Sequence, residues 1–425
     1  MPRARFFLVA QRQLSTHRTA IVVLFACLVC QMGLGLGGYI FAVFLKPVIA
    51  ELGWSRTAFS WAGGPFLLAM ALASPGVGAL TERVGARLVF SGGIILVATA
   101  LIAFSYMETL WHFYLIGFLL GGATTGLGDI PAGAVVSKWF QRNRGLALGL
   151  VYIGSNIGGS IVPIAATELA ALDSWRFALR VLAVSGLILI LPFAAFVVRE
   201  PPKSSDPSDR SDQSDASDLS DLTLAQAMRT PSFWILAGVL FSFYFYYVGI
   251  NHHLVAFLSD NGFSDAEAAR RFGYAVAIGI AGKIGMGLFA DRIPIRGAIV
   301  VNFALMTLGS FLLLFVGNAP GLLPVFLTIH GFTVAAENVV LPLVIVECFG
   351  VTHMARIYGV IMLMLLPGGT FGPVFAGYVF DTLGSYWIAF TTYAAVNVCA
   401  VVALLFLHPL AKNRRAAHAG RVAGG

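Results

Sequence analysis

The sequence has little charge for its length, and this excludes most soluble folds. Asp, Glu, Lys and Arg make up 11% of the 425 residues, whereas hydrophobic residues make up 58%. A typical soluble domain is about 25% charged. Cysteine is also scarce, and the four cysteines show no metal-ligand spacing and predict no disulfide. The sequence has no phosphate-binding loop or nucleophile motif, which disfavours an enzyme.

Long apolar runs take the place of charge. Runs of about 20 apolar residues can cross a membrane as helices, and helices satisfy their backbone hydrogen bonds internally in lipid. Continuous runs do not fit the alternating strands of a β-barrel. We therefore predict an all-α membrane protein with twelve transmembrane helices. These cover residues 20–45, 57–80, 88–106, 111–137, 145–169, 177–198, 233–258, 268–290, 297–316, 322–349, 356–378 and 387–407.

The distribution of basic residues predicts the orientation. Of the 27 Lys and Arg residues, 20 lie in the termini and in the loops after even-numbered spans, and six lie on the other loop face. Because positively charged loops stay in the cytoplasm, both termini are predicted to be cytoplasmic. The net charge of +7 then reflects membrane topology and not nucleic-acid binding. The first span is too long for a cleaved signal, and the Ala-, Arg- and Gly-rich composition favours a bacterial inner membrane.

Residues 199–230 interrupt the hydrophobic pattern. The dipeptide Ser-Asp occurs six times between Ser205 and Asp221. Such a polar tract cannot bury a core, so we interpret it as a disordered cytoplasmic linker, with a regulatory serine cluster as the alternative. Leu222–Arg229 is expected to form a short helix on the inner surface. The predicted domains are an N-terminal half (1–198), the linker (199–230), a C-terminal half (231–410) and a basic tail (411–425).

The two halves resemble each other at an offset of about 210 residues. Matching motifs follow the second span and lie in the fifth span of each half: Gly78-x3-Glu82-Arg83 with Gly287-x3-Asp291-Arg292, and Gly158-Gly159-x3-Pro163 with Gly368-Gly369-x3-Pro373. We therefore predict two six-helix pseudo-repeats. Parallel repeats of this kind place a substrate site near the midplane between the halves and rock around it. The glycine-rich stretch Gly33–Gly38 lies inside a span and fits close helix packing.

This organisation resembles the major facilitator superfamily. Segment 78–87 (GALTERVGAR) is similar to that superfamily's loop between spans 2 and 3, and the resemblance covers nearly the whole chain. In that loop an acid and arginines lock helix ends on the cytoplasmic side. The resemblance therefore implies conformational gating by one group of residues in each half: Glu82, Arg83 and Arg87 in the first, and Asp291 and Arg292 in the second.

A narrower resemblance is to the monocarboxylate transporters and the related oxalate/formate antiporters. The motifs that carry it are Phe44-Leu45-Lys46-Pro47 followed by Gly53-Trp54-Ser55-Arg56, then Lys138-Trp139-Phe140-x3-Arg144-Gly145, and Thr230-Pro231-x-Phe233-Trp234. Proton-linked members have a lysine in span 1, where this sequence has Tyr39, and an acid where it has Gly279. Span 11 lacks the second cation of the antiporters, which favours a monoanion over oxalate.

Lys283 is the leading candidate for substrate binding. It lies in the otherwise apolar stretch Phe272–Ala290, and a lone ammonium in hydrocarbon costs about 2.5–3.5 kcal/mol on insertion scales. Such a cation normally faces a bundle interior or a watery cavity, with a counter-charge or an anionic ligand. The resemblance places Lys283 where the monocarboxylate transporters have a substrate-binding arginine, although lysine lacks the planar fork. The alternative is permanent pairing with an acid that holds two helices together.

Two carboxyl groups are candidate proton carriers. Asp129 lies in span 4 and Glu337 in span 10, at about equivalent depth in the two repeats. Asp129 is also a candidate counter-ion to Lys283. The alternatives are a hydrated acid near the inner mouth for Asp129 and interhelical hydrogen bonding for Glu337.

Further polar side chains complete the candidate substrate site. His330 precedes Glu337 by seven residues and shares its helical face, with interhelical hydrogen bonding as the alternative role. His252, Asn338 and Tyr39 are the remaining candidates. For His252 and Tyr39 the alternative is an interfacial position without a role in transport.

Together these features predict a secondary transporter that moves a small organic anion by alternating access, with a monocarboxylate favoured. Proton coupling is left open, because the family's coupling residues are missing. The alternatives are an organic-anion exchanger, an exporter of cationic or amphipathic drugs held by Asp129 and Glu337, and a sensor without flux. We expect a monomer with no cofactor and no nucleic-acid partner, whose partners are the anion, the lipid bilayer and, in the coupled case, a proton.

Overall fold

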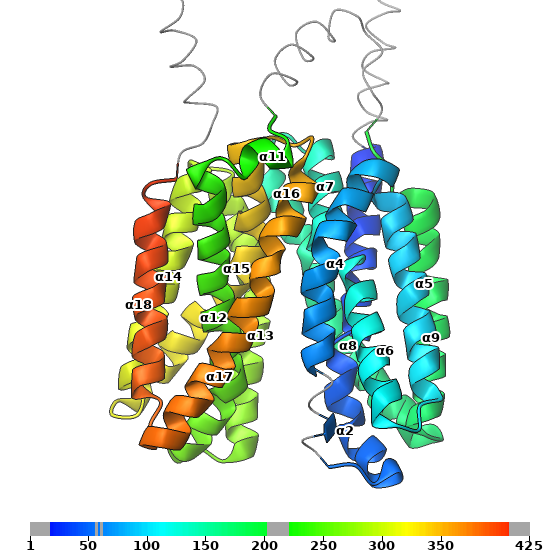
Figure 1. Cartoon of the computed structure of the whole chain (residues 1–425), viewed down its shortest axis with the longest axis vertical. Coiled ribbons are helices and arrows are strands. Elements are labelled where there is room, and N and C mark those ends of the chain that lie inside the picture. The colour runs from blue at the N-terminus through cyan, green and yellow to red at the C-terminus, as the bar shows by residue number, and fades with distance from the viewer. Residues whose placement is uncertain (1–17, 56–57, 60–62, 202–220, 408–425) are drawn as a thin grey trace, which may run out of the picture. The chain divides into compact units, whose positions relative to one another are not determined.

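The computed structural model describes residues 18–55, 58–59, 63–201 and 221–407, and every regular element in these ranges is helical (Figure 1). The chain divides into two compact units. Unit 1 comprises Met1–Ala73 and Leu80–Ser204, and unit 2 comprises Ser74–Ala79 and Ser205–Gly425. Most of the Ser-Asp tract and the predicted basic tail lie outside the described residues.

Unit 1 begins with a helix over residues 18–32. The elements that follow are η1 (Gly33–Leu36), α2 (Tyr39–Leu52), α4 (Gly63–Val84), α5 (Ala86–Ser105), α6 (Leu110–Thr125), α7 (Asp129–Trp139), α8 (Arg144–Leu172), α9 (Trp175–Pro192) and the π-helical turn η2 (Phe193–Val197). Helix α5 packs against α6 and α9, and α8 packs against η1 and α9.

Unit 2 contains residues 74–79 of α4 and the remaining elements. They are α11 (Leu224–Ala227), α12 (Pro231–Asp260), α13 (Asp265–Ala290), α14 (Ile295–Phe315), η3 (Pro320–Leu322), α15 (Leu323–Phe349), α16 (Met354–Ile361), η4 (Met362–Met364), α17 (Leu365–Leu383) and α18 (Trp387–Leu404). Helix α15 packs against α13 and α14, and α12 packs against α17 and α18.

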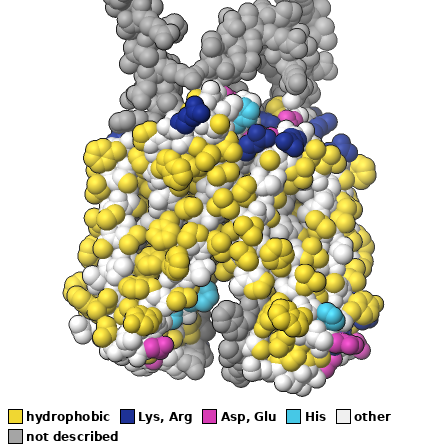
Figure 2. Space-filling view, viewed as in Figure 1, with side chains coloured by type: hydrophobic (Ala, Val, Ile, Leu, Met, Phe, Trp, Pro, Cys, Tyr) yellow, Lys and Arg dark blue, Asp and Glu magenta, His cyan; other side chains and the backbone are white. Residues whose placement is uncertain are grey.

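The predicted number of membrane spans is confirmed. Within the described ranges, 12 helical segments are long and apolar enough to cross a membrane. Many large apolar side chains on them stay exposed, among them Leu88, Trp111 and Ile188. Figure 2 shows hydrophobic side chains over the sides of each unit, with most of the visible Lys and Arg gathered at one end. The chain is therefore a multi-pass membrane protein.

Two spans of unit 1 are broken, which the continuous apolar runs did not predict. The first span passes from the helix at 18–32 into η1 and a turn before α2. A Cβ atom on Gly35 would lie 2.3 Å from the carbonyl oxygen of Gly158 in α8. The glycine-rich stretch thus serves close packing, as expected, and it also interrupts the helix.

The fourth span is broken between α6 and α7. Its helix stops at Thr125, and the N–H of Gly126 bonds back to the carbonyl of Ala123 at 3.0 Å. Gly128 then precedes Asp129, which opens α7. The break therefore places an acidic side chain at a new helix N-terminus inside the span.

The end of the predicted linker is structured. The carboxylate of Asp221 accepts hydrogen bonds from the backbone N–H and the hydroxyl of Thr352. The short predicted helix is present as α11, where Thr223 and Gln226 form a reciprocal capping box. These contacts hold the chain against α16 before α12 begins at Pro231.

Candidate functional site

Unit 2 holds two ionisable side chains that are unusual for their burial. Lys283 is 3% exposed and Glu337 is 1% exposed. Across the described ranges, Lys283 is the one buried Lys or Arg and Glu337 is the one buried Asp or Glu. They lie on α13 and α15, two helices that pack extensively against each other. Because ionisable groups inside a membrane are costly, they mark functional positions by default.

Lys283 lies next to a close crossing of α13 and α15. The preceding residue is Gly282, and a Cβ atom there would lie 2.3 Å from the backbone oxygen of Phe332 in α15. A larger residue would therefore separate the two helices. Lys283 is the next residue along α13, and its side chain is buried.

The side-chain amide of Asn302 in α14 forms a hydrogen bond with Glu337. Asn302 Nδ2 donates to Glu337 Oε2 at 3.2 Å and to the carbonyl of Thr333 at 3.2 Å. The second carboxyl oxygen, Oε1, and the amide oxygen of Asn302 have no hydrogen-bond partner among the described residues. Buried polar atoms rarely stay unpaired, so this pair has unused hydrogen-bonding capacity.

His330 uses both ring nitrogens inside unit 2. Its Nε2 lies 3.0 Å from Asn251 Oδ1, and its Nδ1 lies 2.8 Å from the hydroxyl of Tyr246. Since an amide oxygen only accepts, Nε2 carries the proton and Nδ1 accepts from the tyrosine, which describes a neutral imidazole. The ring also stacks on Phe326 at 5.4 Å. His330 therefore ties α12 to α15, which is the alternative role considered from the sequence.

A second polar cluster was not singled out in the sequence. Ser242 donates to Asn397 Oδ1 at 2.9 Å, and Asn397 Nδ2 donates to Ser310 Oγ at 3.2 Å. These buried contacts join α12, α18 and α14. The available signal was an amide inside an apolar span, a signal that Asn302 and Asn397 share.

The two adjacent histidines of α12 have different surroundings. His252 is exposed, and its Nδ1 lies 3.0 Å from the carbonyl of Val248 in its own helix. His253 instead contacts the hydroxyl of Tyr386 at 3.2 Å and the carbonyl of Pro373 at 3.0 Å. Burial raises the pKa of Tyr386 above its ordinary value, and the nearby carboxylates of Asp260 and Asp381 add to this effect. The phenol thus stays protonated and donates to His253 Nδ1.

For two further candidate residues, the structure shows, within its described ranges, no side-chain contact that would indicate a role. Asn338 follows Glu337 on α15, is half-buried, and forms no hydrogen bond with other described residues. Tyr39 opens α2, but its side chain lies outside the described part of the structure. Both stay predictions.

In unit 1, Asp129 is half-buried at the first position of α7. Its Oδ1 accepts from Gln31 Nε2 at 3.0 Å, and its backbone carbonyl accepts from the hydroxyl of Tyr152 at 3.2 Å. A carboxylate is favourable at a helix N-terminus, because the helix dipole is positive there. The broken span therefore supports a negative charge at Asp129.

The predicted gating residues lie at helix ends. Arg83 and Arg87 are exposed on either side of Gly85, the single residue that separates α4 from α5. Glu82 is half-buried in the last turn of α4. In the second half, Asp291 caps α13, and Arg292 donates to the carbonyl of Leu288 at 3.1 Å.

The buried polar groups of unit 2 include both charged and neutral side chains. Within the described ranges, no group of three or more His, Cys, Asp or Glu side chains is placed to hold a metal ion. Unit 2 instead offers one buried cation, one buried acid and several neutral donors and acceptors. Such a set can hold a small anion and exchange a proton.

Comparisons with known proteins agree with this fold. The sequence model of the Major Facilitator Superfamily matches residues 27–322. Monocarboxylate transporter 13 of Rattus norvegicus is 28% identical over 84% of this chain and 81% of its own length. The fujikurins efflux protein of Gibberella fujikuroi is 24% identical over 78% of this chain and 69% of its own length. The crystal structure of the human organic anion transporter MFSD10 has a TM-score of 0.68 at 18% identity, covering 92% of this chain and 99% of that one.

Proposed function

The chain belongs to the major facilitator superfamily, and on this premise we propose that it is a secondary transporter for a small organic monoanion, specifically a monocarboxylate. Members of this superfamily carry small molecules across lipid bilayers.

One observation supports the anion above the others. Lys283 is buried in a membrane span, and no other described Lys or Arg is buried. A carboxylate near Lys283 offsets the cost of keeping the ammonium out of water. A single buried cation suits one negative charge better than two. Monocarboxylate transporters 13 of Rattus norvegicus and Bos taurus are among the relatives, which is consistent with this class.

In the proposed cycle, Lys283 binds the carboxylate of the substrate. Helices α13 and α15 then move so that the bound substrate is open first to one side of the membrane and then to the other. His330 keeps α15 fixed against α12 through its two hydrogen bonds. His252, Asn338 and Tyr39 remain predicted contacts for the rest of the substrate.

Glu337 is the proposed proton carrier. In the ionised state its Oε2 accepts from Asn302 Nδ2. In the protonated state the carboxyl can donate to Asn302 Oδ1 once the amide turns, since the two amide ends exchange donor for acceptor. Asn302 can therefore face Oε2 in both charge states, and Oε1 has no hydrogen-bond partner among the described residues. Asp129 is the second proposed acid, held at the N-terminus of α7.

Export of a cationic or amphipathic compound is the second candidate. It is favoured by the relative named as a fujikurins efflux protein and by the acid at the break of the fourth span. In that case Asp129 and Glu337 bind the cargo, and Lys283 stabilises the bundle.

Uptake into proteoliposomes separates the two candidates. We expect purified protein to take up radiolabelled pyruvate, and unlabelled pyruvate and lactate to compete. Pyruvamide has the same shape without the charge, so it should not compete. An inward proton gradient applied in the same assay tests coupling. Competition by lipophilic cations with no effect of carboxylates would contradict the monocarboxylate proposal.

A further inference from the structure

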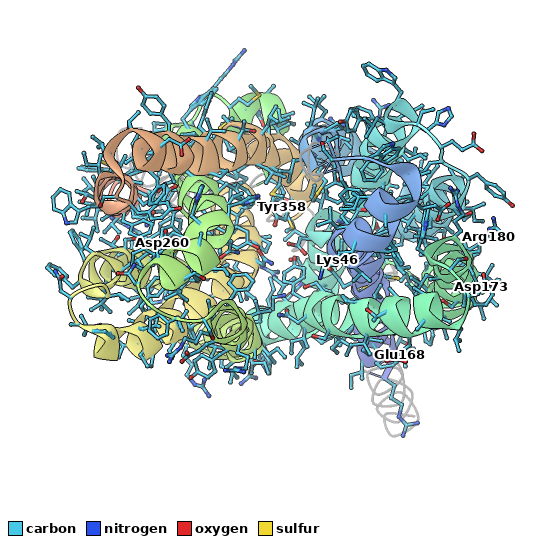
Figure 3. All side chains as sticks on the ribbon, turned by 90° about the horizontal axis from the view of Figure 1, so that it is seen from below. Lys46, Glu168, Asp173, Arg180, Asp260 and Tyr358 are labelled. Carbon is cyan, nitrogen blue, oxygen red and sulfur yellow. The ribbon has the colours of Figure 1, made fainter. Side chains whose placement is uncertain are left out.

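An open cavity of about 300 Å³ lies in unit 2, at the end where α13 begins. We name it the arginine pocket. Its lining comes from Glu267, Arg270, Arg271 and Tyr274 of α13 and from Pro324 and Leu327 at the start of α15. Figure 3 views the protein from the end where α12 finishes at Asp260, shortly before α13 begins.

The guanidinium of Arg271 is fixed but incompletely paired. Its Nη2 donates to Glu267 Oε1 at 2.7 Å, and its carbon Cζ lies 4.5 Å from the ring centroid of Phe263. Its Nε is buried and has no hydrogen-bond partner within the described residues. A guanidinium has five N–H donors, and the contact with Glu267 uses one of them.

Other arginines of the same loop face are paired by the protein itself. Arg176 donates to Glu51 and to the backbone carbonyls of Ser105 and Met107. Arg180 donates to Ser105 Oγ at 3.1 Å and lies over the ring of Tyr106 at 4.6 Å. Arg176 therefore uses three of its hydrogen bonds within the protein, whereas one is found for Arg271 among the described residues.

The lining combines positive charge with an apolar wall. The described lining residues contribute two guanidinium groups and one carboxylate, which gives these residues a net charge of +1. Leu327 and Pro324 form the apolar part, and the hydroxyl of Tyr274 lies 3.4 Å from Thr328 Oγ1. The volume lies at the lower end of the roughly 300–1,000 Å³ usual for ligand sites. A small oxyanion with a short apolar tail suits this chemistry.

We propose that the arginine pocket is a second binding site for a small carboxylate, separate from Lys283. The identity of the carboxylate rests on the proposed function. Arg271 and Lys283 are twelve residues apart on α13, which at helical rise is about 18 Å. An anion captured at the pocket is concentrated near the transport site, so the pocket acts on capture at low concentration and not on the maximal rate.

Direct binding to purified full-length protein carrying Lys283→Ala isolates this pocket. Titration calorimetry with pyruvate should still show one site in this variant. Adding Arg271→Gln should weaken the remaining site at least about tenfold, the cost of a charge-assisted hydrogen bond. Adding Arg180→Gln removes an equal charge elsewhere on the same loop face and should leave binding unchanged.

A variant that binds pyruvate more tightly controls for misfolding, because a misfolded protein would lose affinity. Glu267→Gln removes the carboxylate that competes for Arg271, so pyruvate should bind several-fold more tightly. In otherwise wild-type protein, Arg271→Gln should raise the KM for uptake and leave the maximal rate unchanged. High salt should reduce this difference, because screening weakens electrostatic capture.

Each outcome decides the proposal. No binding to the Lys283→Ala protein, or binding that survives Arg271→Gln, overturns the arginine pocket even where uptake proceeds. Binding that depends on Arg271 without any uptake upholds the pocket and contradicts the proposed function. An anionic headgroup is the other source of this chemistry. Displacement of pyruvate by phosphatidylglycerol at lower concentration assigns the pocket to lipid and overturns the solute site.

Discussion

Glu337 receives one hydrogen-bond donor, and its other oxygen is unpaired within the described structure. A buried carboxylate without a full set of donors is costly to keep ionised. Its protonation is therefore expected to change as the transport site fills and empties. This makes Glu337 the residue at which proton coupling is best tested.

Glu337→Gln should abolish the stimulation of uptake by an inward proton gradient. Glutamine keeps the shape and can bond to either end of Asn302, but it cannot exchange a proton. Exchange of internal for external pyruvate, which needs no net proton movement, should persist. Glu347→Gln is the matched control, because Glu347 is exposed on the same helix. Full gradient stimulation in Glu337→Gln protein would exclude Glu337 as the carrier.

His330 is expected to contribute mainly to stability. His330→Ala leaves Tyr246 and Asn251 without their partner, and interhelical hydrogen bonds in membranes contribute about 1–2 kcal/mol. The thermal unfolding midpoint in detergent should therefore fall by several degrees. His252→Ala removes an exposed ring that contacts its own helix and should leave the midpoint unchanged. Equal midpoints for the two variants would contradict this assignment.

At the scale of elements, close helix crossings are set by glycine. Within α8, a Cβ atom on Gly158 would lie 2.0 Å from the carbonyl oxygen of Met32. Gly92 in α5 has no neighbour within 4 Å of the same position. Both glycines lie within helices, but Gly158 packs against another backbone and Gly92 does not.

Gly158→Ala should destabilise unit 1 by about 1–3 kcal/mol, because the backbones must separate. Gly92→Ala should be neutral or stabilising by up to about 1 kcal/mol, since alanine favours a helix over glycine. Thermal unfolding of the two variants in the same detergent measures the difference. A loss of stability in Gly92→Ala alone would contradict the proposed role of the crossing.

Some features of the helices could be predicted from the sequence, and others could not. Apolar length predicts the number of spans, because each must satisfy its own backbone in lipid. It does not predict the breaks after Met32 and Thr125, because glycine-rich helices stop or continue according to their tertiary neighbours. The structured end of the linker was not predicted for a similar reason, because Asp221 is held by a hydrogen bond from Thr352, which is distant in the sequence.

At the scale of the whole molecule, the sequence identified a buried cation and a buried acid from their apolar surroundings. It did not identify their partners. Asn302 and Tyr246 are identified as partners only from the structure, because their hydrogen bonds join residues on different helices. The arginine pocket was present in the sequence only as two of the six basic residues on one loop face. Contact geometry, and not residue type, distinguishes Arg271 from Arg176.

The central claim is that Lys283 neutralises the carboxylate of the substrate. The most direct test is the initial rate of radiolabelled pyruvate uptake into proteoliposomes containing wild-type, Lys283→Ala or Lys283→Arg protein, each checked for monodispersity. We predict that alanine lowers the rate at least about 100-fold, the upper range for a charge-assisted hydrogen bond. Arginine keeps the charge and should retain measurable uptake. Uptake by Lys283→Ala at the wild-type rate would contradict the account.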